Sequence, residues 1–72
     1  MRQPRAEDRV ELMRDMPDVD LHSGAVGVIC ATWFMPDPVY EIEFTQADEA
    51  FPIRSLVFAE YFRIIETAAV ES

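Results

Sequence analysis

The chain has 72 residues, half of them apolar, and a net charge of −8. A composition this apolar excludes a disordered acidic tail, and the length provides for one domain only. The six basic residues are all arginine and form no basic stripe, which argues against binding to nucleic acid or to an anionic membrane surface. One cysteine excludes an internal disulfide, and no leader or membrane-length apolar run occurs, so we predict a cytoplasmic protein.

The size of the chain predicts contact between copies. A domain of this length buries only about 60% of the surface that its unfolded chain exposes. Because half of the residues are apolar, additional burial between identical chains is expected, and we predict a homo-oligomer.

The N-terminal part of the chain predicts an arm followed by a strand. Residues 1–7 are polar and predict a flexible arm, residues 8–66 a single domain and residues 67–72 a C-terminal tail. Apolar and charged residues alternate over residues 8–13, as in a half-buried strand whose Val10 and Leu12 face inward.

A loop and a long strand are expected next. Residues 16–24 are rich in Pro, Asp, Ser and Gly and predict a loop, with Val19 and Leu21 folded beneath it. Residues 24–34 are uncharged, β-branched and aromatic, which is typical of a strand buried on both faces, with Cys30 as a small buried side chain. Gly27 within this strand indicates a bulge or a close approach of the backbone.

Two further strands follow from the pattern. Residues 35–38 contain two prolines and predict the turn of a hairpin. In residues 39–44 the side chains of Tyr40, Ile42 and Phe44 are expected to face inward and those of the two glutamates outward. Residues 51–58 predict a fourth strand, which Pro52 confines to an edge of the sheet at its start.

The C-terminal part of the chain allows two interpretations. Apolar residues at helical spacing fit an amphipathic helix over residues 59–70. Alternatively, residues 59–61 form one helical turn and residues 62–65 a short closing strand. The β-branched pair Ile64-Ile65 and the need to cover a sheet edge favour the closing strand.

Short strands joined by tight turns in so short a chain predict a mostly β fold. We expect a small curled barrel of four to five antiparallel strands, because closing a sheet removes exposed edges.

The order of these elements also resembles a known family. The segments that carry the resemblance are Arg9-Val10-Glu11-Leu12, Met16-Pro17, Leu21-His22-Ser23-Gly24-Ala25-Val26-Gly27-Val28-Ile29 and Tyr40-Glu41-Ile42-Glu43-Phe44. They resemble the bacterial domain of unknown function 4926, whose members look like small SH3-like barrels. The resemblance covers about residues 8–65 and implies an SH3-like barrel. It implies no catalytic residue, since that family has no established activity.

Candidates for chemistry are weak. Asp18, Asp20 and His22 carry ligand types for a divalent metal, but such residues also occur in ordinary turns, and we predict no metal site. Cys30 has no activating partner nearby in the sequence, and no nucleotide or zinc motif occurs. We therefore predict no catalytic residue, no cofactor and no enzymatic activity.

An apolar hairpin is the most informative feature. Trp33, Phe34 and Met35 are consecutive, so they cannot all face one core, and Tyr40 opens the returning strand beside them. Contiguous exposed apolar side chains mark contact surfaces, although a small barrel could also wrap them over its open end. A second, weaker candidate patch comprises Tyr61 and Phe62, with Ile65.

These residues predict a protein-interaction module that self-associates, or docks on another protein, through the hairpin. The alternative is a protein that binds a small ligand or a peptide in an aromatic pocket between hairpins, lined by Trp33, Tyr40 and Tyr61.

Overall fold

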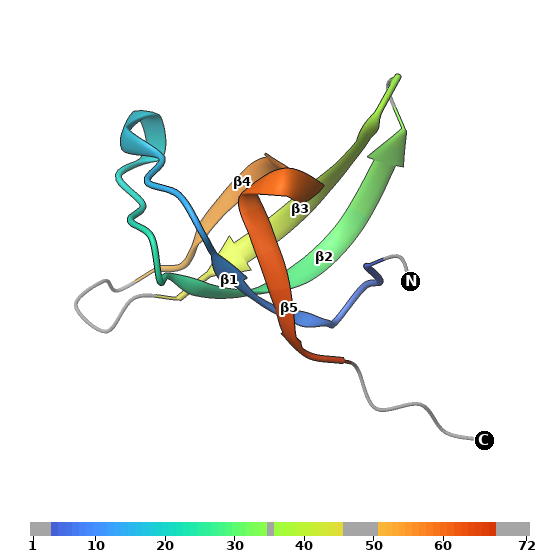
Figure 1. Cartoon of the computed structure of the whole chain (residues 1–72), viewed down its shortest axis with the longest axis horizontal. Helices are drawn as coiled ribbons and strands as arrows, with labels where there is room; N and C mark the ends of the chain where they lie inside the picture. Colours follow the sequence, from blue (N-terminus) through green and yellow to red (C-terminus); the bar gives the residue numbers. More distant parts are fainter. Residues whose placement is uncertain (1–3, 35, 46–50, 68–72) are drawn as a thin grey trace.

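The computed structural model describes residues 4–34, 36–45 and 51–67, which form a single five-stranded antiparallel sheet (Figure 1). Along the chain the elements are β1 (Arg9–Leu12), the 3₁₀ turn η1 (Pro17–Val19), β2 (Val26–Phe34), β3 (Pro38–Phe44), β4 (Ile53–Phe58), the 3₁₀ turn η2 (Ala59–Tyr61) and β5 (Phe62–Glu66). Across the sheet the order is β4-β3-β2-β1-β5, so the last strand returns to pair with the first. The predicted mostly β, antiparallel fold is confirmed.

The C-terminal part of the described chain is a helical turn followed by a strand. The favoured interpretation, one helical turn followed by a short closing strand, is therefore confirmed, because η2 ends at Tyr61 and β5 begins at Phe62. The alternative of an amphipathic helix from residue 59 is wrong. The physical reason is the free edge of β1, which β5 covers by antiparallel pairing. Arg63 strengthens this pairing, since its Nη2 donates to Glu11 Oε1 at 2.7 Å.

The sheet curls without closing. β4 and β5 are the two ends of the strand order, and no bridge joins them among the described residues. Nevertheless the ring of Tyr40 on β3 meets the ring of Phe62 on β5 edge to face, with centroids 5.4 Å apart. Two strands, β2 and β1, lie between β3 and β5 in the sheet, so this contact requires the sheet to be strongly curved. In Figure 1, β5 accordingly crosses the other strands steeply.

One core lies inside the curl. Its buried apolar residues come from every strand and from the loop that carries η1: Val10, Leu12, Leu21, Ile29, Tyr40, Ile42, Phe44, Val57 and Phe62. The alternating inward positions expected in residues 8–13 and 39–44 are confirmed. Leu21 is fully buried and Val19 packs against the core, so the loop covers one end of it as predicted.

A β-bulge in β2 changes which side chains face the core. Ile29 pairs with Ile42 and Ala31 pairs with Glu41, which leaves Cys30 as an extra residue. Side chains alternate along a strand, so Ile29 and Trp33, four residues apart, would face the same side of a regular strand. The extra residue shifts this alternation, and Ile29 faces the core while Trp33 faces outward. The expectation of burial on both faces is wrong, and so is that of a buried Cys30, because no described element covers the outer face of β2.

Two residues of the predicted arm are hydrogen-bonded to the domain, Glu7 to β2 and Arg5 to Asp8. The backbone N–H of Glu7 donates to the carbonyl oxygen of Ile29 at 2.7 Å. Asp8 is completely buried, and its carboxylate accepts the N–H of Arg5 at 2.9 Å. The remainder of the predicted arm and most of the predicted tail lie outside the described residues.

The expected close approach at Gly27 is confirmed. A Cβ atom at this position would lie 2.7 Å from Ile42 Cγ2, 2.8 Å from the backbone oxygen of Glu43 and 2.8 Å from Phe44 Cδ1. Backbone on one side and core side chains on the other leave no room for a methyl group, so β2 and β3 require glycine here.

We expect Gly27→Ala to lower the free energy of unfolding by about 1–3 kcal/mol, since the added methyl overpacks the β2–β3 pairing. Urea unfolding followed by circular dichroism measures this change. Cys30→Ser on the exposed face of the same strand serves as the control and should cost less than about 0.5 kcal/mol. An equal loss of unfolding free energy in Gly27→Ala and Cys30→Ser would contradict the requirement for glycine.

Candidate functional site

The structure separates the aromatic residues that the sequence groups into an interface. Trp33 and Phe34 are 48% and 67% exposed, whereas Tyr40 and Phe62 are 4% and 5% exposed and belong to the core. Tyr40 and Phe62 thus supply packing and almost no surface. Tyr61 is half-buried, and Met35 lies outside the described residues.

The exposed apolar residues continue from Trp33 onto the edge strand. Trp33 pairs with Val39 on β3, and Val39 pairs with Phe58 on β4. Leu56 lies two residues before Phe58 on the same face, and these two side chains are 57% and 50% exposed. We call Trp33, Val39, Leu56 and Phe58 the outer-face patch.

Sequence reasoning missed the contribution of β4 to this surface. A signal was present, because Leu56, Val57 and Phe58 are consecutive and cannot all face one core. Only Val57 is buried. The register between β3 and β4 decides which residues lie beside Trp33, and the pattern of residues does not fix that register.

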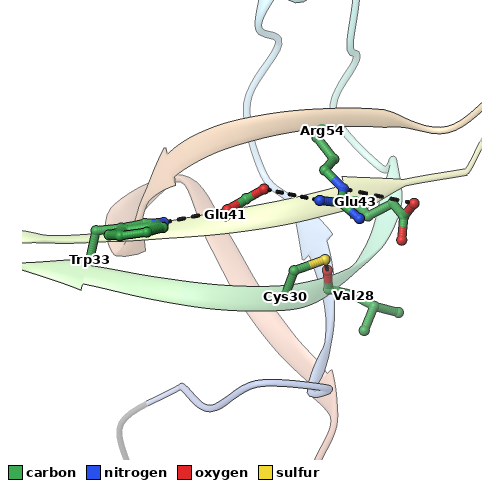
Figure 2. A network of polar contacts seen from close by, with 6 residues as sticks. All are labelled: Val28, Cys30, Trp33, Glu41, Glu43 and Arg54. Atoms are coloured by element: carbon green, nitrogen blue, oxygen red, sulfur yellow. Dashed lines mark hydrogen bonds and ion pairs between the residues drawn. The ribbon is translucent and has the colours of Figure 1, made fainter.

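The carboxylate of Glu41 contacts two polar groups beside the patch (Figure 2). Glu41 Oε1 accepts a hydrogen bond from the indole Nε1 of Trp33 at 3.4 Å, and Glu41 Oε2 accepts one from Nη1 of Arg54 at 3.4 Å. Arg54 Nε also lies 4.0 Å from Glu43 Oε2. Glu41 therefore contacts the indole through one carboxylate oxygen and the guanidinium through the other.

An open hollow of about 450 Å³ lies next to the indole. It is lined by Trp33, Glu41, Arg54, Ser55 and Leu56, and most of its lining is apolar. The hollow opens on the outer face of β3 and β4, so it is not the pocket between hairpins that the sequence predicts. Tyr40 and Tyr61, expected in that pocket, do not line the hollow.

A second hollow of about 300 Å³ lies between β4 and the loop that carries η1. Its lining comprises residues 15–18 of the loop that carries η1, residues 56–58 of β4, and Tyr61. The guanidinium of Arg14 lies 4.8 Å from the ring centroid of Tyr61, so the chain's own cation already contacts this ring. Of the predicted second patch, Phe62 is buried, Tyr61 is half-buried and Ile65 is exposed.

The residues considered for metal binding do not converge on one point. His22 Nε2 lies 4.0 Å from Asp20 Oδ1, and His22 Nδ1 lies 4.0 Å from Asp15 Oδ1. No group of three His, Cys, Asp or Glu residues in the described ranges could hold an ion. Within the same ranges, no helix has the length and apolar character needed to cross a membrane.

We expect Glu41→Ala to free the indole of Trp33, because its N–H loses its hydrogen-bond acceptor. Trp33 is the only tryptophan, so the fluorescence anisotropy of the protein should fall without interference from another indole. The free energy of unfolding should change by less than about 1 kcal/mol, as is usual for exposed polar pairs. Glu43→Ala is the matched control and should leave the anisotropy unchanged. A fall of equal size in both variants would contradict the role of Glu41.

Comparison with known proteins gives one result. The family model described as Domain of unknown function (DUF4926) matches residues 7–51, more than half of the chain. The chain therefore belongs to this family, and the match spans β1, η1, β2 and β3. No curated protein and no solved structure is similar enough to the chain to count as a match.

Proposed function

We propose that this member of the DUF4926 family is a non-enzymatic protein-interaction module that self-associates through the outer-face patch. The observation that carries the proposal is the exposure of Trp33, Leu56 and Phe58 side by side on one face of the sheet. Soluble monomers rarely expose several large apolar side chains in one contiguous group. Aromatic residues are enriched in the cores of protein interfaces, which supports a contact role.

Position in the sheet supports the same proposal. The patch reaches β4, an edge strand whose one described partner is β3. Arg54 is the charged residue of β4, and its guanidinium is engaged by Glu41 and Glu43. Charged side chains normally protect sheet edges from association, and here that charge is neutralised within the chain.

We infer in addition that the fold is an SH3-like curled barrel. Three features support this finer description: the pairing of the last strand with the first, the single helical turn between β4 and β5, and the contact between Tyr40 and Phe62 across the core. Such barrels often serve binding roles, but the fold alone assigns no function.

Trp33→Glu should convert the oligomer into a folded monomer. A carboxylate buried at the centre of an apolar contact without a partner is strongly unfavourable, whereas the exposed position tolerates it in the monomer. Sedimentation velocity measures the oligomeric state, and circular dichroism checks the fold. Phe51→Glu is the control, because Phe51 is 80% exposed and is not part of the outer-face patch. A wild-type monomer at high micromolar concentration would refute self-association.

Salt should strengthen the self-association. Each copy carries a net charge of −8, so copies repel one another at low ionic strength. Raising sodium chloride from about 20 to about 500 mM shortens the screening length and should lower the dissociation constant. A basic partner would show the opposite dependence. Weaker association at high salt would thus indicate that ionic contacts, and not the apolar patch, hold the copies together.

A second candidate function is the binding of a small ligand or a peptide in the hollow beside Trp33. The specific observation in its favour is the size of the hollow, about 450 Å³, with an indole and a carboxylate in its lining. Quenching or a shift of Trp33 fluorescence by added ligand would support this candidate, particularly if the protein were monomeric.

A further inference from the structure

We infer that the hollow between β4 and the loop that carries η1 binds an extended, arginine-bearing segment of another protein. This hollow, called here the edge groove, is lined by residues 15–18, residues 56–58 and Tyr61. Binding at the edge groove does not require the proposed self-association, because it involves a different partner. Three features of the groove point to this partner: its position at a strand edge, its mixed apolar and acidic lining, and its charge.

The edge groove lies along the free edge of β4. Leu56, Val57 and Phe58 are consecutive and all line it, although Val57 is buried and its two neighbours are exposed. Because side chains alternate along a strand, three consecutive residues line one hollow where that hollow follows the edge of the strand. Among the described residues β4 pairs only with β3, so backbone N–H and C=O groups on its other side are available. An extended segment therefore fits this edge as an added strand.

The lining matches the two parts of a long cationic side chain. Met16, Pro17 and Phe58 supply apolar surface, whereas Asp15 and Asp18 supply carboxylates. Long basic side chains lay their apolar stem along apolar surface while the charged head stays among polar groups. A cavity of about 150 Å³ already holds benzene, so the groove of about 300 Å³ has room for one such side chain.

Charge complementarity selects a basic partner. The chain carries a net charge of −8, and the carboxylates of Asp15 and Asp18 outnumber the one nearby cation, Arg14. The Tyr61 ring already contacts a guanidinium, since Cζ of Arg14 lies 4.8 Å from its centroid. Arginine suits the groove better than lysine, because a planar guanidinium both stacks on aromatic rings and pairs with a carboxylate through two hydrogen bonds.

A nuclear magnetic resonance titration with an acetylated, amidated hexapeptide of alternating arginine and valine tests the inference. The amide signals of residues 15–18 and 56–61 should shift, whereas the indole N–H signal of Trp33, beside the other hollow, should stay in place. Hydrogen exchange in β4 should slow at alternate residues, since an added strand bonds every second amide. The same peptide with glutamine in place of arginine should bind at least about fivefold more weakly, because it lacks the ion pairs.

Two pairs of matched variants locate the charge effect. Asp18→Asn removes one groove carboxylate at constant size and should weaken peptide binding about threefold, as expected for one exposed ion pair. Asp37→Asn, in the turn between β2 and β3, changes the net charge equally but lies outside the groove, and it should have less than half of that effect. Arg14→Gln should tighten binding, because it removes a positive charge beside the groove. Arg9→Gln on β1 is its control.

The opposite results would overturn the inference. An absence of shifts at about 1 mM peptide, or equal binding of the arginine and glutamine peptides, would reject a site for basic segments. Equal effects of Asp18→Asn and Asp37→Asn would do the same, and unchanged exchange in β4 would reject the added strand. Trp33→Glu should bind the peptide as the wild type does. A wild-type monomer that binds the peptide would therefore refute self-association and retain the edge groove.

Discussion

An extra residue in β2 determines which surface this protein presents. Without the bulge at Cys30, Ile29 and Trp33 would lie on the same side of the strand, since they are four residues apart. The bulge reverses the alternation between them, so Ile29 remains in the core and the indole reaches the outer face. The hydrogen bond to Glu41, the hollow and the outer-face patch all depend on this reversal.

Local alternation made much of the fold predictable. Residues 39–44 alternate without interruption, so the inward positions of Tyr40, Ile42 and Phe44 follow directly from the pattern. The η2–β5 segment was harder, because its apolar spacing also fits a helix. The free edge of β1 decided between the two, and that requirement is tertiary rather than local.

The surface was less predictable than the core. The residues of the outer-face patch come from three strands and are brought together by register, which a one-dimensional pattern does not contain. The predicted interface therefore included Tyr40 and Phe62, which pack inside, and omitted Leu56 and Phe58, which lie outside. The exposed Cys30 was misplaced for a related reason, since an uncharged strand can have one uncovered face.

The pairing of β1 with β5 also has a kinetic consequence. The guanidinium of Arg63 and the carboxylate of Glu11 are 52 positions apart in the sequence, so the sheet is completed only by a long-range contact. The chain loses loop-closure entropy before the contacts between distant strands form and stabilise it, and this slows folding. During synthesis β1 must therefore wait for β5 to emerge before it gains its second neighbour, whereas the β2–β3 hairpin can form locally at once.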